Sequence, residues 1–216
     1  MKDYIRMKNN KPIYSQNYCD LSRPELVELM EKTLSKRRFK HVLRVEKTAL
    51  KLAEAYNADK EKVSIAALAH DYAKEKPDEE MRDLIISENL DLEMLQFGSN
   101  IWHGPVGAVL MKNEYHLDDE EIQDAIKYHT IGSPRMDIVA QIIYIADFIE
   151  PNRSFNGVED ARQLAKTDLE STIAYISRHT LKNLIKRKAK IYPKAIETYN
   201  VWGVKNKEEQ DDPFVY

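Results

Sequence analysis

The sequence predicts a single all-α domain, and three observations support that fold class. The 216 residues include only six glycines, whereas average usage gives about 15 in a chain of this length, and this shortage argues against turn-rich β architectures. Apolar residues recur at helical spacing along most of the chain, and no alternating run bounded by turn residues is convincing as a strand. Because no repeat, low-complexity block or linker divides the chain, we expect one domain of helices.

The first three predicted helices carry two histidines on their apolar faces. The first helix begins near Ser22, which is followed by a proline and by Glu25 in the pattern of a capping box. The second covers residues 39–56, where His41 belongs to a stripe of apolar positions at helical spacing. In the third, His70 closes another such stripe, which begins at Val63. Both imidazoles are therefore expected to point inward.

The middle of the chain gives less regular signals. Residues 76–78, Lys-Pro-Asp, start a weaker helix that runs through Ile85. Residues 89–100 fit no element clearly. Residues 104–105, Gly-Pro, then open a helix, and His103 stands just before its first turn.

The next two helices place further polar residues where burial is expected. Asp118 and Glu121 form a capping pair, and the helix that follows aims His129 inward before the sequence Gly-Ser-Pro ends it. Residues 136–150 are so apolar that we expect burial on most sides, with Asp147 inside this helix.

The C-terminal part begins with helix breakers. Residues 151–152, Pro-Asn, end the apolar helix, and residues 156–157, Asn-Gly, mark a turn. Asp168 caps a long helix that runs to about residue 191, and Pro193 begins or kinks the last helix.

These elements divide the chain into one domain with two short extensions. Residues 1–20 lack periodicity and are expected to form an N-terminal tail. Residues 21–203 form the domain, and residues 204–216 a charged C-terminal tail.

Composition excludes several classes of partner. A net charge of −3 gives no general attraction to nucleic acid or to an anionic membrane. No stretch approaches the roughly 18–20 apolar residues of a membrane helix, and the first residues lack the apolar segment of a secretory signal. The single cysteine, Cys19, cannot form an internal disulfide, which fits a reducing compartment. We expect a cytoplasmic protein that holds any anionic ligand by a local arrangement.

Several polar side chains are predicted at buried positions, among them three histidines and Asp147. A lone inward histidine is usually a hydrogen-bonded core residue, and a lone buried aspartate usually caps a turn or pairs with arginine. Four or five such cases in one small domain would each need a partner to offset a desolvation cost of about 1–3 kcal/mol. A shared metal site satisfies them together. Imidazole and carboxylate ligands without thiolates suit Fe, Mn, Co or Zn and disfavour a structural cysteine-type zinc site.

The adjacent pair His70 and Asp71 is the most specific element. A carboxylate beside a metal-binding imidazole can bridge to a second ion. Two ions about 3.5–4 Å apart lower the pKa of a bridging water and neutralise the phosphate that it attacks.

The order of these residues resembles a known family. It matches the H…HD…H…H…D signature of the HD-domain metal-dependent phosphohydrolases, and the segments around it resemble the YqeK family over residues 22–202. That family comprises bacterial symmetrical bis(5′-nucleosyl)-tetraphosphatases, which split diadenosine tetraphosphate into two ADP. The matching segments are His41-Val42-Leu43-Arg44-Val45, Ala69-His70-Asp71-Tyr72-Ala73-Lys74, His103-Gly104-Pro105-Val106-Gly107-Ala108, Tyr128-His129-Thr130-Ile131-Gly132 and Ala146-Asp147-Phe148-Ile149-Glu150-Pro151-Asn152-Arg153.

The resemblance implies an HD-domain helical bundle with a dinuclear divalent metal centre. Iron is the metal that it suggests, with Mn, Co or Zn as alternatives, and a homodimer is the assembly that relatives suggest. A bridging water or hydroxide would attack a phosphorus of the tetraphosphate. One ion would be held by His41, His70, Asp71 and Asp147. Asp71 would bridge to a second ion, which His103 and His129 complete.

Four further residues are predicted to bind substrate. Lys74 stands one turn after His70 on what we expect to be the same helix, where a cation could hold a phosphate against the metals; we count it with Asp71 as catalytic. Its alternative is a solvated lysine at a helix end. Arg153 follows a helix stop and suits bidentate phosphate contacts, although it could be an ordinary loop arginine. The last two are Arg44, which is near His41, and Thr130, which is beside His129. The alternative role of Thr130 is to cap a helix.

The remaining conspicuous residues are expected to be structural. The other basic residues around the second helix are interpreted as a solvated face: Lys36, Arg37, Arg38 and Lys40. His116 and His179 lie outside the matching segments and are interpreted as ordinary surface or helix histidines. Trp102 is expected to pack in the wall of the site rather than to stack on a base.

The sequence therefore predicts metal-dependent symmetrical hydrolysis of diadenosine tetraphosphate. One alternative is another HD-domain activity, on mononucleotides or on guanosine alarmones. A second alternative is a non-catalytic helical module that binds metal or nucleotide and regulates a partner, although the complete ligand set argues against it.

Overall fold

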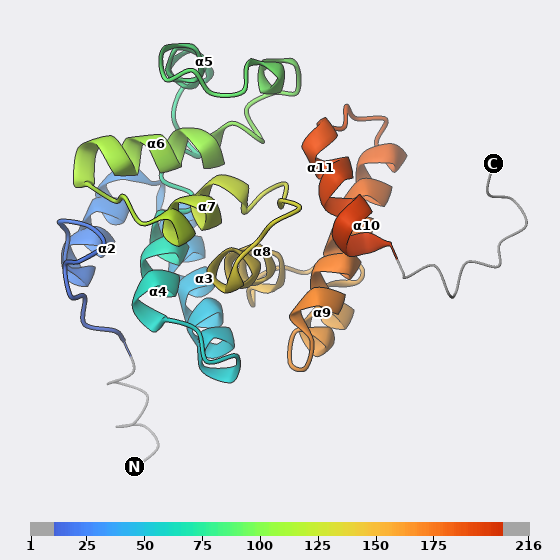
Figure 1. Cartoon of the computed structure of the whole chain (residues 1–216), viewed down its shortest axis with the longest axis horizontal. Coiled ribbons are helices and arrows are strands. Elements are labelled where there is room, and N and C mark those ends of the chain that lie inside the picture. The colour runs from blue at the N-terminus through green and yellow to red at the C-terminus, as the bar shows by residue number, and fades with distance from the viewer. Residues whose placement is uncertain (1–10, 205–216) are drawn as a thin grey trace, which may run out of the picture.

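Helices α4 and α8 lie at the centre of the molecule in a computed structural model that describes residues 11–204 (Figure 1). Each of them contacts both α3 and α7, and they contact one another. Within the described residues no strand occurs, so the all-α prediction is confirmed. The elements in chain order are α2 (Arg23–Thr33), α3 (Lys36–Ala55), α4 (Lys60–Ala69), α5 (Asp78–Ser87), the 3₁₀ helix η1 (Leu92–Gln96), α6 (His103–Tyr115), α7 (Glu120–Tyr128), α8 (Ile138–Ile149), α9 (Val158–Leu164), α10 (Leu169–Lys186), α11 (Pro193–Thr198) and the π-helical turn η2 (Tyr199–Gly203).

The two central helices are buried because their sequences are apolar nearly all round. All seven residues from 63 to 69 of α4 are buried. Three of them are alanine, which lets the neighbouring helices approach closely. Helix α8 buries eight of its twelve residues. This burial confirms that residues 136–150 cross the core, and it explains why a charged residue in α8 needs a specific partner.

The other helices surround this centre in two groups. Helix α2 packs against α3 and α4, and α6 packs against α7. On the opposite side of α8 from α2, α9 and α10 pack against α8, and α11 packs against α10 (Figure 1). None of the described helices combines the length and the apolar character that crossing a membrane requires.

Helix starts follow the predicted capping signals, with one shift. The capping box of Ser22 and Glu25 is formed at the start of α2, and Asp168 caps α10 by accepting a hydrogen bond from the Ser171 backbone. The predicted cap Asp118 is wrong by one residue. Asp119 takes that position, and its carboxylate accepts from the backbone N–H of Ile122 at 3.2 Å.

Three elements differ from the sequence prediction. Helix α4 ends at Ala69, and the chain then continues in turns that are closed by hydrogen bonds from residue i+3 to residue i. Lys74 therefore does not share a continuous helix with His70. Helix α9 was not expected; it begins directly after Gly157, whose φ of +91° suits glycine. Helix α10 stops at Lys186 rather than near residue 191, because Lys188 adopts a positive φ of 53°.

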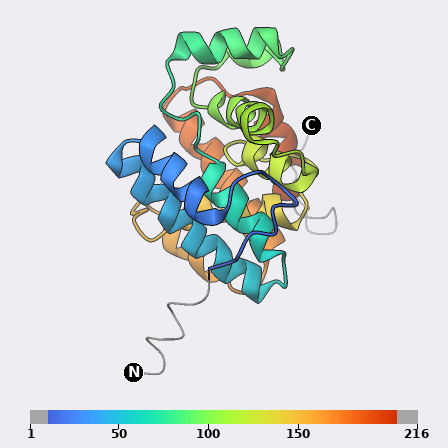
Figure 2. The same ribbon diagram turned by 90° about the vertical axis from the view of Figure 1, so that its left-hand side faces the viewer.

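The described part of the predicted N-terminal tail lies against the helices. Tyr14 and Cys19 are buried, and residues 11–20 pass in front of α4 (Figure 2), with the Asp20 backbone N–H donating to the Tyr115 carbonyl at the end of α6. Ser64 of α4 donates its hydroxyl proton to Glu46 at 2.6 Å, so the Tyr14 hydroxyl at 2.8 Å must donate to Ser64. This buried network holds the segment in place. Residues 1–10 and the charged C-terminal residues 205–216 lie outside the described residues.

Candidate metal centre

The six residues predicted as metal ligands come from five helical segments and meet at one point. His41 lies in the second turn of α3, His70 and Asp71 follow the end of α4, and His103 begins α6. His129 follows the end of α7, and Asp147 lies near the end of α8. All are buried except Asp147, which is 20% exposed. The helix ends thus place imidazoles and carboxylates inside the core.

Asp71 faces the two halves of this cluster with its two carboxylate oxygens. Its Oδ2 lies 3.4 Å from His70 Nε2 and 3.6 Å from His41 Nε2. Its Oδ1 lies 3.3 Å from His103 Nε2 and 3.9 Å from His129 Nε2. The ligand atoms of each set of three residues, Asp71 included, lie within 4.8 Å of one another. This placement is what a carboxylate that bridges two ions requires.

Asp147 belongs to the first set of ligand atoms. Its Oδ1 lies 3.0 Å from His41 Nε2. Nonetheless Nε2 of His41 has no aligned hydrogen-bond partner among the described residues, and the same holds for the buried Nε2 of His70. Two buried nitrogens without a partner are costly unless something else binds them. Their lone pairs and the nearby carboxylates fit a divalent metal ion.

Backbone carbonyls fix the imidazoles in the form that binds metal. His70 Nδ1 lies 2.7 Å from the Ala67 carbonyl, and His129 Nδ1 lies 2.7 Å from the Ile126 carbonyl. Because a carbonyl only accepts, both Nδ1 atoms carry the ring proton. The Nε2 atoms then present lone pairs to the centre, which is the arrangement typical of metal-binding histidines.

Glu150 plays the same role for His41, and sequence reasoning missed it. Its Oε1 lies 3.2 Å from His41 Nδ1, and Arg44 donates to its Oε2 at 2.7 Å. Glu150 is only 2% exposed. The signal available in the sequence was a carboxylate placed one helical turn after Asp147. The predicted substrate residue Arg44 therefore lies behind His41, with its guanidinium bound to Glu150.

A second missed residue is Arg38, which was interpreted as part of a solvated face. Its Nη1 donates to Asp71 Oδ2 at 2.8 Å, and the side chain is only 20% exposed. It stands three positions before His41, so both point to the same side of α3. The interpretation of Arg38 as a solvated residue was wrong. Its position on α3 faces the buried carboxylate of Asp71, and the ion pair with that carboxylate keeps the guanidinium out of solvent.

The structure brings three of the four predicted substrate residues to the centre. Lys74 Nζ lies 3.4 Å from His103 Nδ1, and Thr130 Oγ1 lies 3.0 Å from His129 Nε2. Arg153 donates to Asp147 Oδ1 at 2.5 Å, and its Nε donates to the carbonyl of the same residue. Their cationic and hydroxyl groups therefore border the ligand cluster.

Electrostatics favour ionised carboxylates and neutral imidazoles in most of the cluster. Burial opposes ionisation of Asp71, but the adjacent imidazoles of His70 and His103 hold its pKa well below the usual range. Burial and the neighbouring histidines lower the pKa of His129 to about 3, and burial lowers the pKa of His103 as well. These are the protonation states in which such side chains bind metal.

Two residues depart from this pattern for identifiable reasons. Burial alone would lower the pKa of His70, but the Asp71 carboxylate outweighs it and raises that pKa. Burial lowers the pKa of Lys74, and Arg38 nearby acts in the same direction against the attraction of Asp71. A half-buried lysine beside other cations is poised to receive an anionic group.

Three residues were expected to have structural rather than catalytic roles, and two of them, His116 and Trp102, lie where they were expected. His116 is exposed and pairs with Asp20 at 2.6 Å. Trp102 is buried, and its Nε1 donates to the Met94 carbonyl at 2.7 Å, which confirms a packing role. His179 differs, because it lines a pocket that also includes Asp147.

Comparisons with known proteins agree with this geometry. The HD domain family model matches residues 38–152. A Bacillus subtilis protein named "Bis(5′-nucleosyl)-tetraphosphatase, symmetrical" is 41% identical over 180 residues, which cover 83% of this chain and 97% of that protein. A Staphylococcus aureus protein of the same name is 39% identical over 186 residues, which cover 85% of this chain and 96% of that protein.

A solved structure shows the same arrangement of helices. It is a Clostridium acetobutylicum protein described as a "predicted HD superfamily hydrolase involved in NAD metabolism". The TM-score is 0.79 at 35% sequence identity, and the match covers 84% of this chain and 97% of that chain. The chain therefore belongs to the HD-domain family, in the branch that includes the symmetrical bis(5′-nucleosyl)-tetraphosphatases.

Proposed function

We propose that this protein is a metal-dependent hydrolase that splits diadenosine tetraphosphate symmetrically into two ADP. The observation that carries the proposal is the position of Asp71, whose two oxygens face two separate sets of buried imidazoles. The names of relatives about 40% identical over most of the chain support the substrate.

The reaction is an attack of water on one of the two central phosphorus atoms. The oxygen of water bonds to that phosphorus and gives up a proton, and the bond from this phosphorus to the oxygen that joins the two central phosphorus atoms breaks. Each half then leaves as ADP. Two divalent ions would make the water a better nucleophile and neutralise the attacked phosphate. They would be held by the six ligands His41, His70, Asp71, His103, His129 and Asp147.

The cations of the chain itself complement the substrate. Lys74 and Arg153 border the ligand cluster and carry charges that suit phosphate oxygens. Arg38 of α3 donates a hydrogen bond to the Asp71 carboxylate and stabilises its negative charge. Thr130 offers a hydroxyl beside His129 for a phosphate oxygen. Arg44, with its guanidinium bound to Glu150, positions His41 and would reach substrate only at its exposed edge.

Several finer points belong to this proposal. Iron is the metal that we expect, with manganese, cobalt and zinc as alternatives that accept the same ligands. We also propose a cytoplasmic homodimer with a catalytic domain of residues 21–203. Sedimentation of the metal-loaded protein would give twice the mass of one chain if the homodimer forms.

Product analysis tests the proposed activity. The purified protein is incubated with diadenosine tetraphosphate, with mononucleotides and with guanosine alarmones, and the products are separated by chromatography. ADP as the main product from the dinucleotide supports the proposal. Release of phosphate or pyrophosphate from the other compounds, without cleavage of the dinucleotide, would support the alternative HD-domain activities. Binding of nucleotides without any turnover would indicate the regulatory module.

A further inference from the structure

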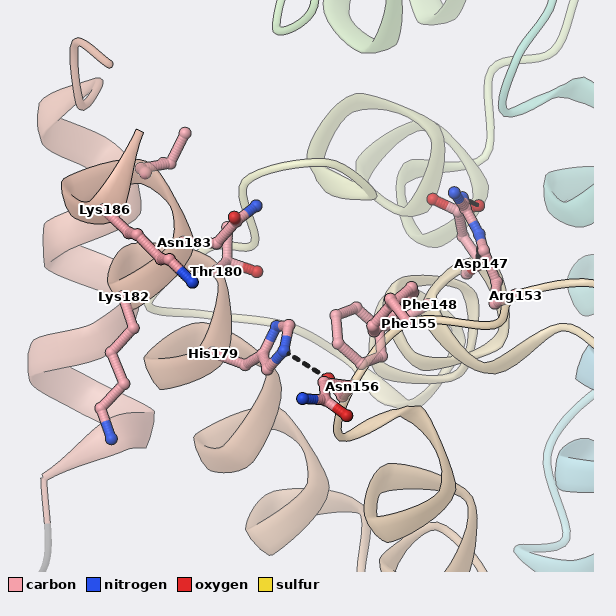
Figure 3. A pocket seen from close by; sticks show the side chains of 11 residues that line it. Asp147, Phe148, Arg153, Phe155, Asn156, His179, Thr180, Lys182, Asn183 and Lys186 are labelled. Carbon is pink, nitrogen blue, oxygen red and sulfur yellow. Dashed lines mark hydrogen bonds and ion pairs between the residues drawn. The ribbon is translucent and has the colours of Figure 1, made fainter. Parts of the chain in front are cut away.

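A pocket of about 620 Å³ opens beside the metal centre, between the end of α8 and α10 (Figure 3). Asp147 and Arg153 form one end of it, and side chains of α10 form the other. This volume lies within the usual range for small-molecule sites, about 300–1,000 Å³. The pocket therefore continues directly from the ligand cluster and has room for a part of the substrate that the metal centre does not hold.

Aromatic rings line the middle of the pocket. The ring centroids of Phe148 and Phe155 are 4.8 Å apart, and His179 lies 5.4 Å from each of them. His179 Nε2 donates to the Asn156 carbonyl at 2.9 Å, which fixes the imidazole and leaves Nδ1 as an acceptor when the ring is neutral (Figure 3). Such a fixed wall of rings suits the flat face of a nucleobase.

A glycine allows this wall to form. A Cβ at Gly157 would collide with the Tyr175 hydroxyl and come within 3.3 Å of the His179 ring. Without a side chain at this position, the loop that carries Phe155 can close against α10. The positive φ of Gly157 also lets the chain turn from this loop into α9.

The outer wall of the pocket is strongly basic. No acidic residue occurs between Glu170 and Glu197, although the chain as a whole has a net charge of −3. Lys182 and Lys186 stand four residues apart on α10 and line the pocket, and in the described part of the chain neither forms an ion pair with a carboxylate. The stretch between these glutamates contains seven basic residues: Arg178, Lys182, Lys186, Arg187, Lys188, Lys190 and Lys194.

We propose that this pocket is a nucleoside subsite, which holds the base and ribose of one half of the dinucleotide while its phosphates reach the metal centre past Arg153. The base packs against Phe155 and His179, and the charges of Lys182 and Lys186 at the outer end of the pocket attract the anionic nucleotide as it enters. The pocket combines an aromatic wall, which inorganic polyphosphate would not use, with lysines, which an uncharged aromatic ligand would not use. A nucleotide uses both. The inference rests on the proposed function, because it assigns part of the same substrate.

Binding of ADP and of inorganic pyrophosphate to the metal-loaded protein tests the subsite without turnover. Phe155→Leu and His179→Leu should each raise the Kd for ADP about tenfold, because they remove a surface on which the base stacks. The Kd for pyrophosphate should change by less than twofold. Lys182→Gln combined with Lys186→Gln should raise both dissociation constants, with a weaker dependence on salt than in the wild type.

Matched controls keep the test specific. Phe97→Leu also removes a half-buried ring that packs on an aromatic neighbour, Tyr192 at 5.2 Å, but outside the pocket. It should leave the Kd for ADP unchanged. Thermal unfolding shows whether each variant is folded, and the two wall variants are independent of one another.

Three outcomes would overturn the subsite. The first is no measurable ADP binding to the wild type, and the second is an ADP Kd within twofold of the wild type in both wall variants. The third is an equal loss of ADP and pyrophosphate in the wall variants. Hydrolysis of diadenosine tetraphosphate by the wild type is measured separately. Absence of cleavage would reject the proposed function and leave the binding data to decide on the pocket.

Discussion

Glu150 Oε1 lies 3.2 Å from His41 Nδ1, while Nε2 of the same ring faces Asp147 Oδ1 at 3.0 Å. The imidazole is thus oriented by a buried carboxylate on one side and points to the ligand cluster on the other. Carboxylates in this position fix the ring and raise its basicity as a metal ligand. Glu150 thus orients a proposed ligand without belonging to the ligand set itself.

Glu150→Gln should weaken metal binding about 10–100-fold, because an amide neither carries the negative charge nor reliably accepts from His41. Titration of the metal-free protein with Mn²⁺ measures this. Glu28→Gln, which changes a carboxylate that is 62% exposed, serves as the control. An unchanged affinity in Glu150→Gln would show that Arg44 and Glu150 only stabilise the fold.

Asp71→Ala should reduce hydrolysis to background and lower the metal content, because both sets of imidazoles lose their shared carboxylate. Elemental analysis and a product assay on the same sample check this. Asp83→Ala replaces an exposed aspartate on α5 and should retain both activity and metal. Activity like the wild type in Asp71→Ala is incompatible with a two-metal mechanism.

Lys74→Ala should lower kcat/KM for diadenosine tetraphosphate about 10–100-fold, which corresponds to one lost charge-assisted contact. Metal content should not change, because Lys74 is no ligand. Lys76→Ala is the matched control, since Lys76 pairs with Glu80 at the surface. If the kinetics of Lys74→Ala equal those of the wild type, Lys74 has no role in holding phosphate.

Acid should weaken the contact between η1 and α11. Lys194 at 2.7 Å and the Tyr192 hydroxyl at 2.6 Å lower the pKa of Asp91 to about 2. Because this value is below that of the unfolded chain, the ion pair stabilises the fold above about pH 4, and that stability is lost as the pH falls toward 2.

Asp91→Asn should therefore lower the free energy of unfolding by about 1 kcal/mol at pH 7 and by about half as much at pH 3. Urea unfolding of both proteins at several pH values measures the difference. A difference that stays constant from pH 7 to pH 3 would mean that the charge of Asp91 contributes nothing.

Much of the fold followed from local signals in the sequence. The capping box at Ser22 and the apolar run of α8 depend only on neighbouring residues, and the structure has both. Helix α9 was missed because its start relies on the close approach of Gly157 to α10 rather than on a capping side chain. Likewise, no local pattern shows that α4 stops at Ala69.

The site divides in the same way. Inward histidines on apolar helix faces could be predicted, because helical periodicity decides which way they point. The contacts of Arg38 with Asp71 and of Glu150 with His41 could not, because they join different helices and depend on how those helices pack. The subsite beside α10 was missed for the same reason, since His179 lies far from the ligand motifs in the sequence.

The most direct test is a metal titration that is followed by product formation. Metal-free protein receives increasing amounts of Mn²⁺ or Fe²⁺ under exclusion of oxygen, and the nucleotides formed from diadenosine tetraphosphate are quantified at each step. We expect no product without metal, ADP alone once metal is added, and a rate that stops rising at about two ions per chain. Formation of ATP with AMP, or full activity at one ion per chain, would contradict symmetrical hydrolysis at a dinuclear centre bridged by Asp71.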